Sequence, residues 1–260
     1  MWSYPLVLAL ASAGVALLER ITPARPSQPA LRRWLWSDAI YLVFNGHFLG
    51  VGLAWAAART VDPLLASRFD LHLASGWSIW VQAIVATVVL DFAQWTIHNL
   101  LHRVPWLWEF HKVHHSVRDG EMDWIVSFRF HWAEVVVYKT LQYLPLAILG
   151  FSGEALFFHA VFGTVVGHLN HANLDWGHGV WRYVLNSPRM HLWHHDADSP
   201  RARNFGIIFS LWDWLFGTAW LPDHPPRRLG FDGERALPPD FFRRSLWPLV
   251  RAPLPPGDPS

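Results

Sequence analysis

One short pattern, His-x-x-His-His, occurs twice in this chain, and its histidines are His111, His114, His115, His191, His194 and His195. Two further pairs have helical spacing: His98 and His102 are four residues apart, and His168 and His171 are three residues apart. Most of the chain's 16 histidines therefore fall between residues 98 and 195. Such regular repetition indicates a built site rather than a histidine-rich composition.

Residues three or four apart on a helix lie on the same face, so each of these motifs can direct two or three ring nitrogens to one side. Imidazole is the commonest metal ligand among side chains. Ten histidines exceed what a single ion coordinates, so the pattern predicts a site for two metal ions. Imidazole ligands suit iron, zinc, copper or nickel, whereas calcium and magnesium prefer oxygen. The spacing alone does not choose among the four.

The composition indicates a membrane protein. Hydrophobic residues make up 52% of the 260 residues and charged residues only 16%, against about 25% charged in soluble domains. The 18 tryptophans and 17 phenylalanines suit a chain that meets a bilayer interface at many points. A formal net charge of +1 gives no reason to expect a nucleic-acid partner. The absence of cysteine excludes disulfides, thiolate-bound zinc, iron–sulfur clusters and a cysteine nucleophile.

Five apolar runs precede or separate the histidine motifs, and they span residues 2–18, 34–58, 73–97, 133–149 and 155–166. The first three approach or exceed the length of about 20 residues that a membrane helix needs. A signal peptide is the alternative for the first run, but no basic residue precedes it and Glu19-Arg20 stands where a cleavage site belongs. The last two runs flank Gly150-Phe-Ser-Gly153 and predict a helical hairpin, either spanning or re-entrant.

We therefore expect an all-α integral membrane bundle of about four to five membrane helices with a cytoplasmic, histidine-rich helical cap. The loop after the first run carries Arg20, Arg25, Arg32 and Arg33, which favours the cytoplasmic side. Counting helices from that loop brings both His-x-x-His-His motifs to the same face. The expected organisation is N-terminal membrane helices over residues 1–72, a catalytic domain over 73–220, and a Pro/Arg-rich C-terminal tail with little regular structure over 221–260.

Polar residues near the histidines are candidates for holding them in place. Asp91 and Gln94 lie near the end of a membrane helix, where a polar group is costly unless it is used. We expect them to hydrogen-bond to liganding imidazoles. His131 and Glu134 have the spacing of a pair that orients a ligand. Asn204 is expected to cap or brace the site.

A metal site at the cytoplasmic end of apolar helices is placed to meet a lipid whose tail lies in the bilayer. Zinc would activate water for hydrolysis there, and iron would use O₂ for oxidation. The chain has no His-Glu-x-x-His motif, and it lacks the Glu and Glu-x-x-His set of carboxylate-bridged di-iron bundles. A zinc-dependent membrane hydrolase and a non-catalytic membrane metal-binding protein remain as alternatives.

Ordered motifs over residues 91–220 resemble the fatty acid hydroxylase / sterol desaturase superfamily. They are Asp91-x-x-Gln-Trp-x-x-His-x-x-x-His102, Leu107-Trp-x-Phe-His-Lys-Val-His-His-Ser116, His191-x-x-His-His195, Asn204-Phe-Gly206 and Leu211-Trp-Asp-x-Leu-Phe-Gly-Thr218. The resemblance implies an integral membrane, non-haem di-iron enzyme that hydroxylates or desaturates an unactivated C–H position of a lipid or sterol-like substrate.

The same resemblance implies the ligands and the partners. The implied iron ligands are His98, His102, His111, His114, His115, His168, His171, His191, His194 and His195. O₂ is the implied co-substrate. Electrons would come from a separate donor of the cytochrome b5, ferredoxin or reductase type.

Overall fold

The structure is a computed structural model that describes residues 4–61, 64, 71–177, 179–199 and 201–250. Within these residues the chain forms helices and no strand, so the all-α prediction is confirmed there. Two isolated backbone bridges, Pro23 with Leu174 and Asp196 with Leu229, join distant loops. Trp2, at the start of the first apolar run, lies outside the described residues, as do Arg68 and Asp70 of the loop before residue 73.

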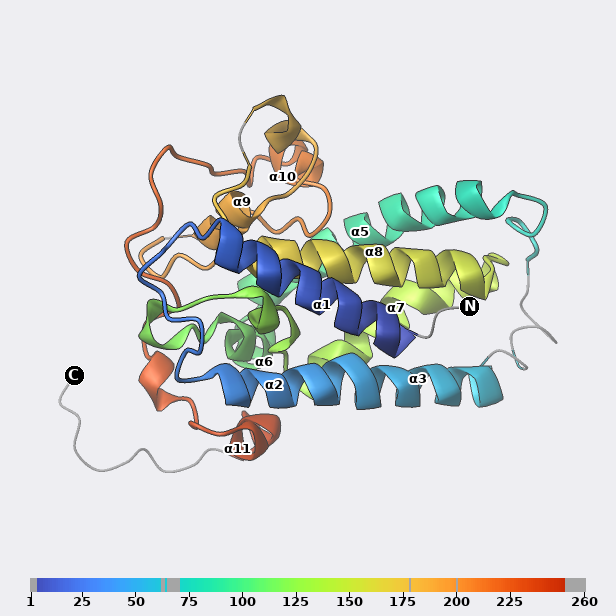
Figure 1. The fold of residues 1–260 in the computed structure, drawn as a ribbon. Coiled ribbons are helices and arrows are strands. Elements are labelled where there is room, and N and C mark those ends of the chain that lie inside the picture. Colours follow the sequence, from blue (N-terminus) through green and yellow to red (C-terminus); the bar gives the residue numbers. More distant parts are fainter. Residues whose placement is uncertain (1–3, 62–63, 65–70, 178, 200, 251–260) are drawn as a thin grey trace.

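Five long helical stretches coincide with the five apolar runs and lie alongside one another (Figure 1). Four of the stretches are single helices: α1 (Tyr4–Ile21), α5 (Ile79–Arg103), α7 (Trp132–Ile148) and α8 (Gly153–His171). The remaining stretch, second along the chain, is made of four consecutive segments: α2 (Leu35–Val43), η1 (Phe44–Leu49), α3 (Gly50–Ala56) and η2 (Ala57–Val61). The predicted hairpin is present as α7 and α8. The Ser152 hydroxyl starts α8 by accepting a hydrogen bond from the Ala155 amide at 3.2 Å.

The shorter helices gather at one end of this bundle (Figure 1). They are α6 (Pro105–His115), η3 (Arg118–Gly120), η4 (Trp124–Phe128), η5 (Val180–Tyr183), α9 (Pro188–His194), α10 (Leu211–Leu215), η6 (Glu234–Ala236) and α11 (Phe241–Leu246). Pro105 ends α5 and occupies the first turn of α6, because proline cannot continue a helix but suits the beginning of one. The chain therefore turns sharply between two histidine-bearing helices.

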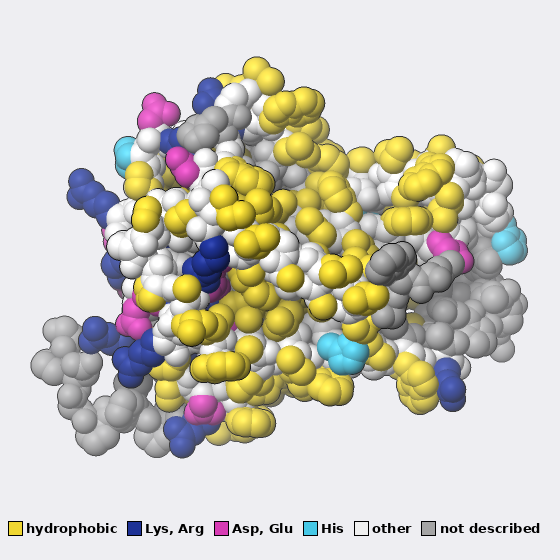
Figure 2. All heavy atoms as spheres, in the orientation of Figure 1, with side chains coloured by type: hydrophobic (Ala, Val, Ile, Leu, Met, Phe, Trp, Pro, Cys, Tyr) yellow, Lys and Arg dark blue, Asp and Glu magenta, His cyan; other side chains and the backbone are white. Residues whose placement is uncertain are grey.

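The surface of the bundle is apolar and its interior contains polar side chains. Trp80 and Ile84 on α5 are about two-thirds exposed, while Gln82 and Gln142 are buried between helices. Most of the charged side chains on the visible face collect at the end that carries the short helices, a few lie at the opposite end, and hydrophobic side chains predominate between them (Figure 2). Among the described helices, α5 is long and apolar enough by length and composition to cross a membrane. The number of membrane helices and the cytoplasmic side of the cap stay predictions.

The C-terminal tail has more structure than its composition suggested. Helix α11 packs the ring of Phe241 against Tyr41 and Phe44 of the second helical stretch, with ring centroids 4.8 and 5.3 Å apart. Arg244 on the same helix is buried and donates to the Ser116 hydroxyl at 3.0 Å. The expectation of little regular structure was wrong for residues 241–246, because one aromatic anchor and one buried guanidinium are enough to fold a short helix here. Residues 251–260 lie outside the described part of the chain.

A buried network of charges joins the N-terminal helices to the histidine-rich end. Asp38 accepts hydrogen bonds from Arg32 at 2.5 Å and from Arg129 at 2.5 and 2.6 Å. Arg32 also donates twice to Asp123 at 2.7 Å. Arg129 in turn donates to the backbone carbonyl of Ser116, the residue after the first His-x-x-His-His motif. Buried charges are tolerated when they are paired in this way.

Asp38→Asn should destabilise the fold strongly, because it keeps the side-chain volume but leaves Arg129 without its counter-charge. Removing one partner of a buried ion pair costs about 3–5 kcal/mol. The measurement is thermal unfolding of the purified protein in detergent, followed by circular dichroism. Asp198→Asn is the matched control, since its pair with Arg228 is about half exposed and should contribute little to stability. Equal losses in the two variants would contradict the network's role.

Candidate metal centre

Four helices bring their histidines to one place at the capped end of the bundle. Helix α5 contributes His98 and His102, and α6 contributes the three histidines of the first His-x-x-His-His motif. Helix α8 contributes His171 in its last turn, and α9 with its C-cap contributes the second motif. The Ser187 hydroxyl and Pro188 start α9, which places that motif at the opposite end of a very short helix.

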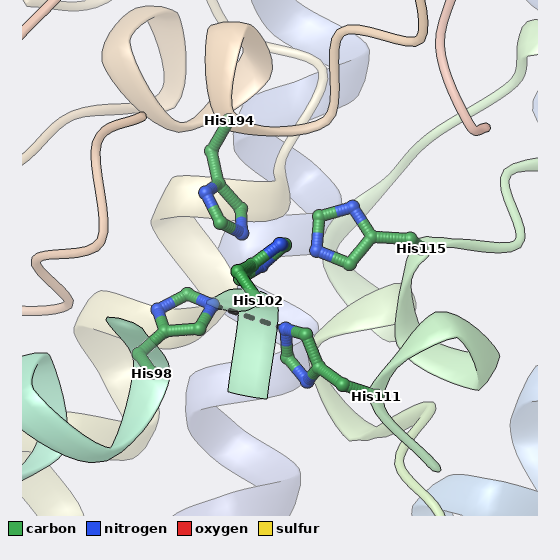
Figure 3. A group of neighbouring side chains, drawn as sticks. All are labelled: His98, His102, His111, His115 and His194. Carbon is green, nitrogen blue, oxygen red and sulfur yellow. Dashed lines mark hydrogen bonds between the residues drawn. The ribbon is translucent and has the colours of Figure 1, made fainter. Parts of the chain in front are cut away.

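The first group of ligand nitrogens comes from His98, His102, His111, His115 and His194. One nitrogen from each of these side chains lies within 4.8 Å of all the others. Figure 3 shows the five rings pointing toward a common centre from α5, α6 and α9. Within this group the Nε2 atoms of His98 and His111 are 3.1 Å apart.

The second group comes from His114, His171, His191 and His195, under the same 4.8 Å limit. The Nε2 atom of His171 lies 3.2 Å from that of His114 and 3.0 Å from that of His191. The Nε2 atoms of His191 and His195 are 3.3 Å apart. The two groups adjoin, because the rings of His115 and His195 have centroids only 4.4 Å apart. The arrangement is that of a paired site.

Hydrogen bonds outside the groups determine which ring nitrogen carries the proton. The Nδ1 atom of His98 lies 2.8 Å from the Phe205 carbonyl, and that of His194 lies 2.7 Å from the Arg203 carbonyl. The Nδ1 atom of His171 lies 2.7 Å from the Gly167 carbonyl. A carbonyl oxygen only accepts, so Nδ1 must be the donor in each ring. The Nε2 atoms of these neutral rings then present lone pairs to the groups, as metal-bound histidines do.

Glu134 acts in the same way on His111, whose Nδ1 atom lies 2.9 Å from the carboxylate Oε1. When Glu134 is ionised it accepts the Nδ1 proton of His111, and His98 and His111 then present unprotonated Nε2 atoms to each other at 3.1 Å. Two lone pairs facing at that distance repel unless a cation lies between them. With metal–nitrogen bonds of about 2.0–2.1 Å, ligand nitrogens on one ion stand about 3.0–3.4 Å apart. The residues present therefore fit metal ions.

The protonation state of four further rings also suits metal binding. Burial, reinforced by neighbouring rings, holds the pKa of His114, His115, His191 and His195 well below the usual value, so these rings are neutral near pH 7. Several buried ring nitrogens have no hydrogen-bond partner among the described residues: His102 Nε2, His115 Nε2, His194 Nε2, His114 Nδ1, His191 Nδ1 and His195 Nδ1. A buried polar atom left unpaired is costly, and a bound metal would remove that cost at those nitrogens that face it.

A loop over residues 203–206 holds two of the ligands and is itself held by buried carboxylates. Asp213 accepts from the amides of Phe205 and Gly206 at 2.9 and 2.8 Å and from the indole of Trp95 at 3.0 Å. Gly206 fits here because an added Cβ would lie 2.3 Å from the Phe209 carbonyl oxygen. Asn204, at a positive φ of 55°, spans the loop by bonding to Met190 and Trp220. Asn204 therefore ties this loop to Met190 at α9 and to Trp220.

Three other candidates have roles that differ from the expected ones. Asp91 accepts from the amides of Ile208 and Phe209 and the indole of Trp212, so it supports the loop rather than an imidazole. Gln94 accepts from Gln142. His131 caps α7 through Nδ1 and bonds to the Ser245 carbonyl through Nε2, which leaves neither nitrogen for Glu134.

His168 is the one implied ligand that the structure does not bring into either group. Both of its ring nitrogens are hydrogen-bonded to hydroxyls, Nε2 to Ser12 at 3.0 Å and Nδ1 to Ser127 at 2.7 Å. The ring is buried and joins α1 to η4. The other nine lie in the two groups. Asp213 and the carbonyls of residues 203 and 205 were missed, although Asn204-Phe-Gly206 and Leu211-Trp-Asp213 stood out in the sequence.

Comparison with known proteins agrees with the site. The family model described as fatty acid hydroxylase matches residues 83–218, slightly more than half of the chain and all nine of the grouped histidines. The chain is 26% identical to an ornithine lipid hydroxylase of Rhizobium tropici, over 85% of this chain and 69% of the relative.

Two further relatives show the spread of similar proteins. The chain is 29% identical to cholesterol 25-hydroxylase-like protein 2 of Danio rerio, over 76% of this chain and 74% of that protein. It is 25% identical to a very-long-chain aldehyde decarbonylase of Oryza sativa subsp. japonica, over 82% of this chain and 72% of that protein. No solved structure matches the chain. From the matched span and the motifs within it, the chain belongs to the fatty acid hydroxylase family.

Proposed function

We propose that this protein is a membrane-bound, di-iron oxidoreductase that hydroxylates or desaturates a C–H position of a lipid or sterol-like substrate with O₂ and external electrons. The observation that carries the proposal is the pair of adjoining histidine groups, in which the Nε2 atoms of neighbouring rings lie 3.0–3.3 Å apart. Two of the relatives named above are lipid or sterol hydroxylases by name. Iron bound in the two groups would supply O₂ activation and abstraction of a hydrogen atom.

The chain's own residues hold and shield such a centre. Carbonyls of residues 167, 203 and 205 and the carboxylate of Glu134 keep the Nδ1 protons in place, so the Nε2 atoms of those four rings stay free to bind. All nine grouped side chains except His102 are buried, which limits water at the centre. The apolar outer surface of the bundle (Figure 2) would keep the lipid chain in the bilayer. The reacting carbon of the lipid would then reach the histidine groups from the membrane side.

A zinc-dependent hydrolase needs a general base that faces the metal. In the described residues, the carboxylate in contact with the histidine groups is Glu134, and it lies on the outer side of the His111 ring, bonded to Nδ1. It is therefore placed to orient a ligand rather than to activate water. The set of ligands therefore favours oxidation over hydrolysis. We expect a separate protein to supply the electrons.

The reaction is tested with purified, iron-loaded protein in lipid nanodiscs that contain candidate lipids and a chemical reductant. We expect O₂ consumption that depends on the lipid, together with a lipid product that has gained one oxygen atom or lost two hydrogens. Release of a free acid or headgroup without O₂ uptake would instead indicate the hydrolase.

Metal content should divide between the two groups. The parent protein should hold about two iron ions per chain, and each double variant about one, because each removes two ligands from a single group. The variants are His102→Ala/His194→Ala for the first group and His114→Ala/His195→Ala for the second. Metal analysis of protein purified under reducing, iron-replete conditions gives the count.

His168→Ala is the matched control for these variants, since its ring is equally buried but bonded to serines. It should keep both ions. Loss of an ion in this control, with the helix content unchanged by circular dichroism, would return His168 to the ligand set.

Glu134→Ala should weaken metal binding at the first group by about 10–100-fold, the usual effect of removing a carboxylate that orients a liganding histidine. Without the carboxylate, His111 can rotate or exchange its proton between ring nitrogens. A competition titration with a metal chelator measures the affinity. Glu154→Ala, at an exposed position of α8, is the control and should leave the affinity unchanged. An unchanged affinity in Glu134→Ala would show that the pair is only structural.

A further inference from the structure

An exposed apolar surface lies beside the metal centre and outside the long helices. It is formed by η5 and α10 and consists of Val180, Trp181, Val184, Trp214, Leu215 and Phe216, each of which is 38–75% exposed. We call it the η5–α10 surface. Large apolar residues exposed together in this way indicate contact with another apolar phase.

The two parts of this surface form one unit. The Trp214 indole donates to the Arg182 carbonyl at 2.8 Å, and the ring of Tyr183 packs on that of Trp214 with centroids 4.9 Å apart. The Ser210 hydroxyl donates to the same carbonyl at 2.8 Å. Residues some 30 positions apart in the sequence are therefore joined by backbone and side-chain bonds, and the apolar side chains are left on the outside.

This surface is continuous with the outward face of α5, the helix long and apolar enough to cross a membrane. The ring of Phe92 on α5 lies 5.0 Å from that of Trp212 and 6.0 Å from that of Phe216, centroid to centroid. The ring of Trp95 stacks on Phe216 at 4.8 Å. Hydrophobic side chains continue from the upper lobe, which contains α10, onto the bundle (Figures 1 and 2).

The position of these contacts along α5 gives the depth. A helix that starts at Ile79 and rises 1.5 Å per residue crosses a core of about 30 Å in about 20 residues. The hydrocarbon edge then falls near His98, and Phe92 lies about 9 Å beneath it. Interfacial amphipathic segments insert their apolar face by about 5–10 Å. Tryptophan and tyrosine are also the residues enriched at that level.

We propose that the η5–α10 surface is inserted in the headgroup–acyl boundary of the bilayer and lies against the lipid beside α5. The proposal rests on α5 spanning the membrane, which is part of the proposed function. This placement has a structural consequence. The loop over residues 203–206 orients His98 and His194, and Asp213 on α10 anchors that loop. Lipid that supports α10 therefore also supports the position of these two histidines.

The chain has no cysteine, so single cysteines can be labelled with an environment-sensitive fluorophore in the full-length protein. Val180→Cys and Leu215→Cys report on the η5–α10 surface. Ile84→Cys, on the exposed face of α5, reports on the membrane span, and Asp232→Cys, at a side chain that is 86% exposed, reports on the polar end. Each protein is reconstituted in nanodiscs with lipids that carry a nitroxide quencher either at the headgroup or at mid-chain.

We expect headgroup-level quencher to reduce the fluorescence at residues 180 and 215 about twofold or more, with less effect from mid-chain quencher. Residue 84, about 7–8 Å inside the opposite edge of the hydrocarbon core, should be quenched by either label, and residue 232 by neither. If residue 84 is quenched but residues 180 and 215 are not, the surface faces water or a protein partner and the proposal fails while the span holds. If no position is quenched, the membrane placement itself is wrong. Quenching at residues 180 and 215 but not at residue 84 would show that the η5–α10 surface contacts lipid and that α5 does not span the membrane.

Discussion

Two unprotonated imidazole nitrogens that face each other at 3.1 Å are the constraint on which the rest of this structure depends. His98 and His111 meet in this way because each donates its only ring proton to an acceptor on the far side, the Phe205 carbonyl and the Glu134 carboxylate. His171 likewise donates from Nδ1 to a backbone carbonyl, and its Nε2 atom lies 3.2 Å from that of His114 in the second group. The repulsion between such lone pairs is relieved by a cation, so the fold has assembled its ligands at the expense of stability in the absence of metal.

That cost explains why so much of the surrounding structure consists of buried polar bonds. Asp213 and Asp91 fasten the loop that holds His98 and His194. Together they accept hydrogen bonds from the backbone amides of residues 205, 206, 208 and 209. The end of α6 is fastened through Ser116 to Arg129 and Arg244. These bonds differ from apolar packing in being directional, so they orient rings as well as bring them close. Asp91 and Asp213 bond to backbone amides and Glu134 bonds to a histidine, and none of these three carboxyl groups belongs to either histidine group.

The sequence predicted the histidines and the helices well, because both depend on local spacing. The two His-x-x-His-His motifs and the hairpin around Gly150 needed only helical periodicity and a turn. The partners of the ligands could not be predicted, since they are set by contacts between residues up to about 120 positions apart. Asp91 was expected to bond to an imidazole and instead bonds to the amides of Ile208 and Phe209. His168 has the same spacing to His171 as His111 has to His114, yet it is bonded to Ser12 and Ser127. Residue type and spacing are alike in the two cases, and the packing of α1 and η4 against α8 separates them.

The polar side chains buried within the long helices also need hydrogen-bond partners inside the protein. A helix that meets lipid on one side can hold buried polar side chains only where a neighbouring helix satisfies them. Gln82 does so by bonding to the carbonyls of Ala74 and Trp77 and the amide of Ser152. The amide bond from Ser152 holds α5 against the start of α8 at the end of the bundle away from the histidine groups. At the other end α5 contributes His98 to the first group and α8 contributes His171 to the second, and the two groups adjoin. The same pair of helices therefore carries both the candidate metal centre and the apolar face that we propose to meet lipid.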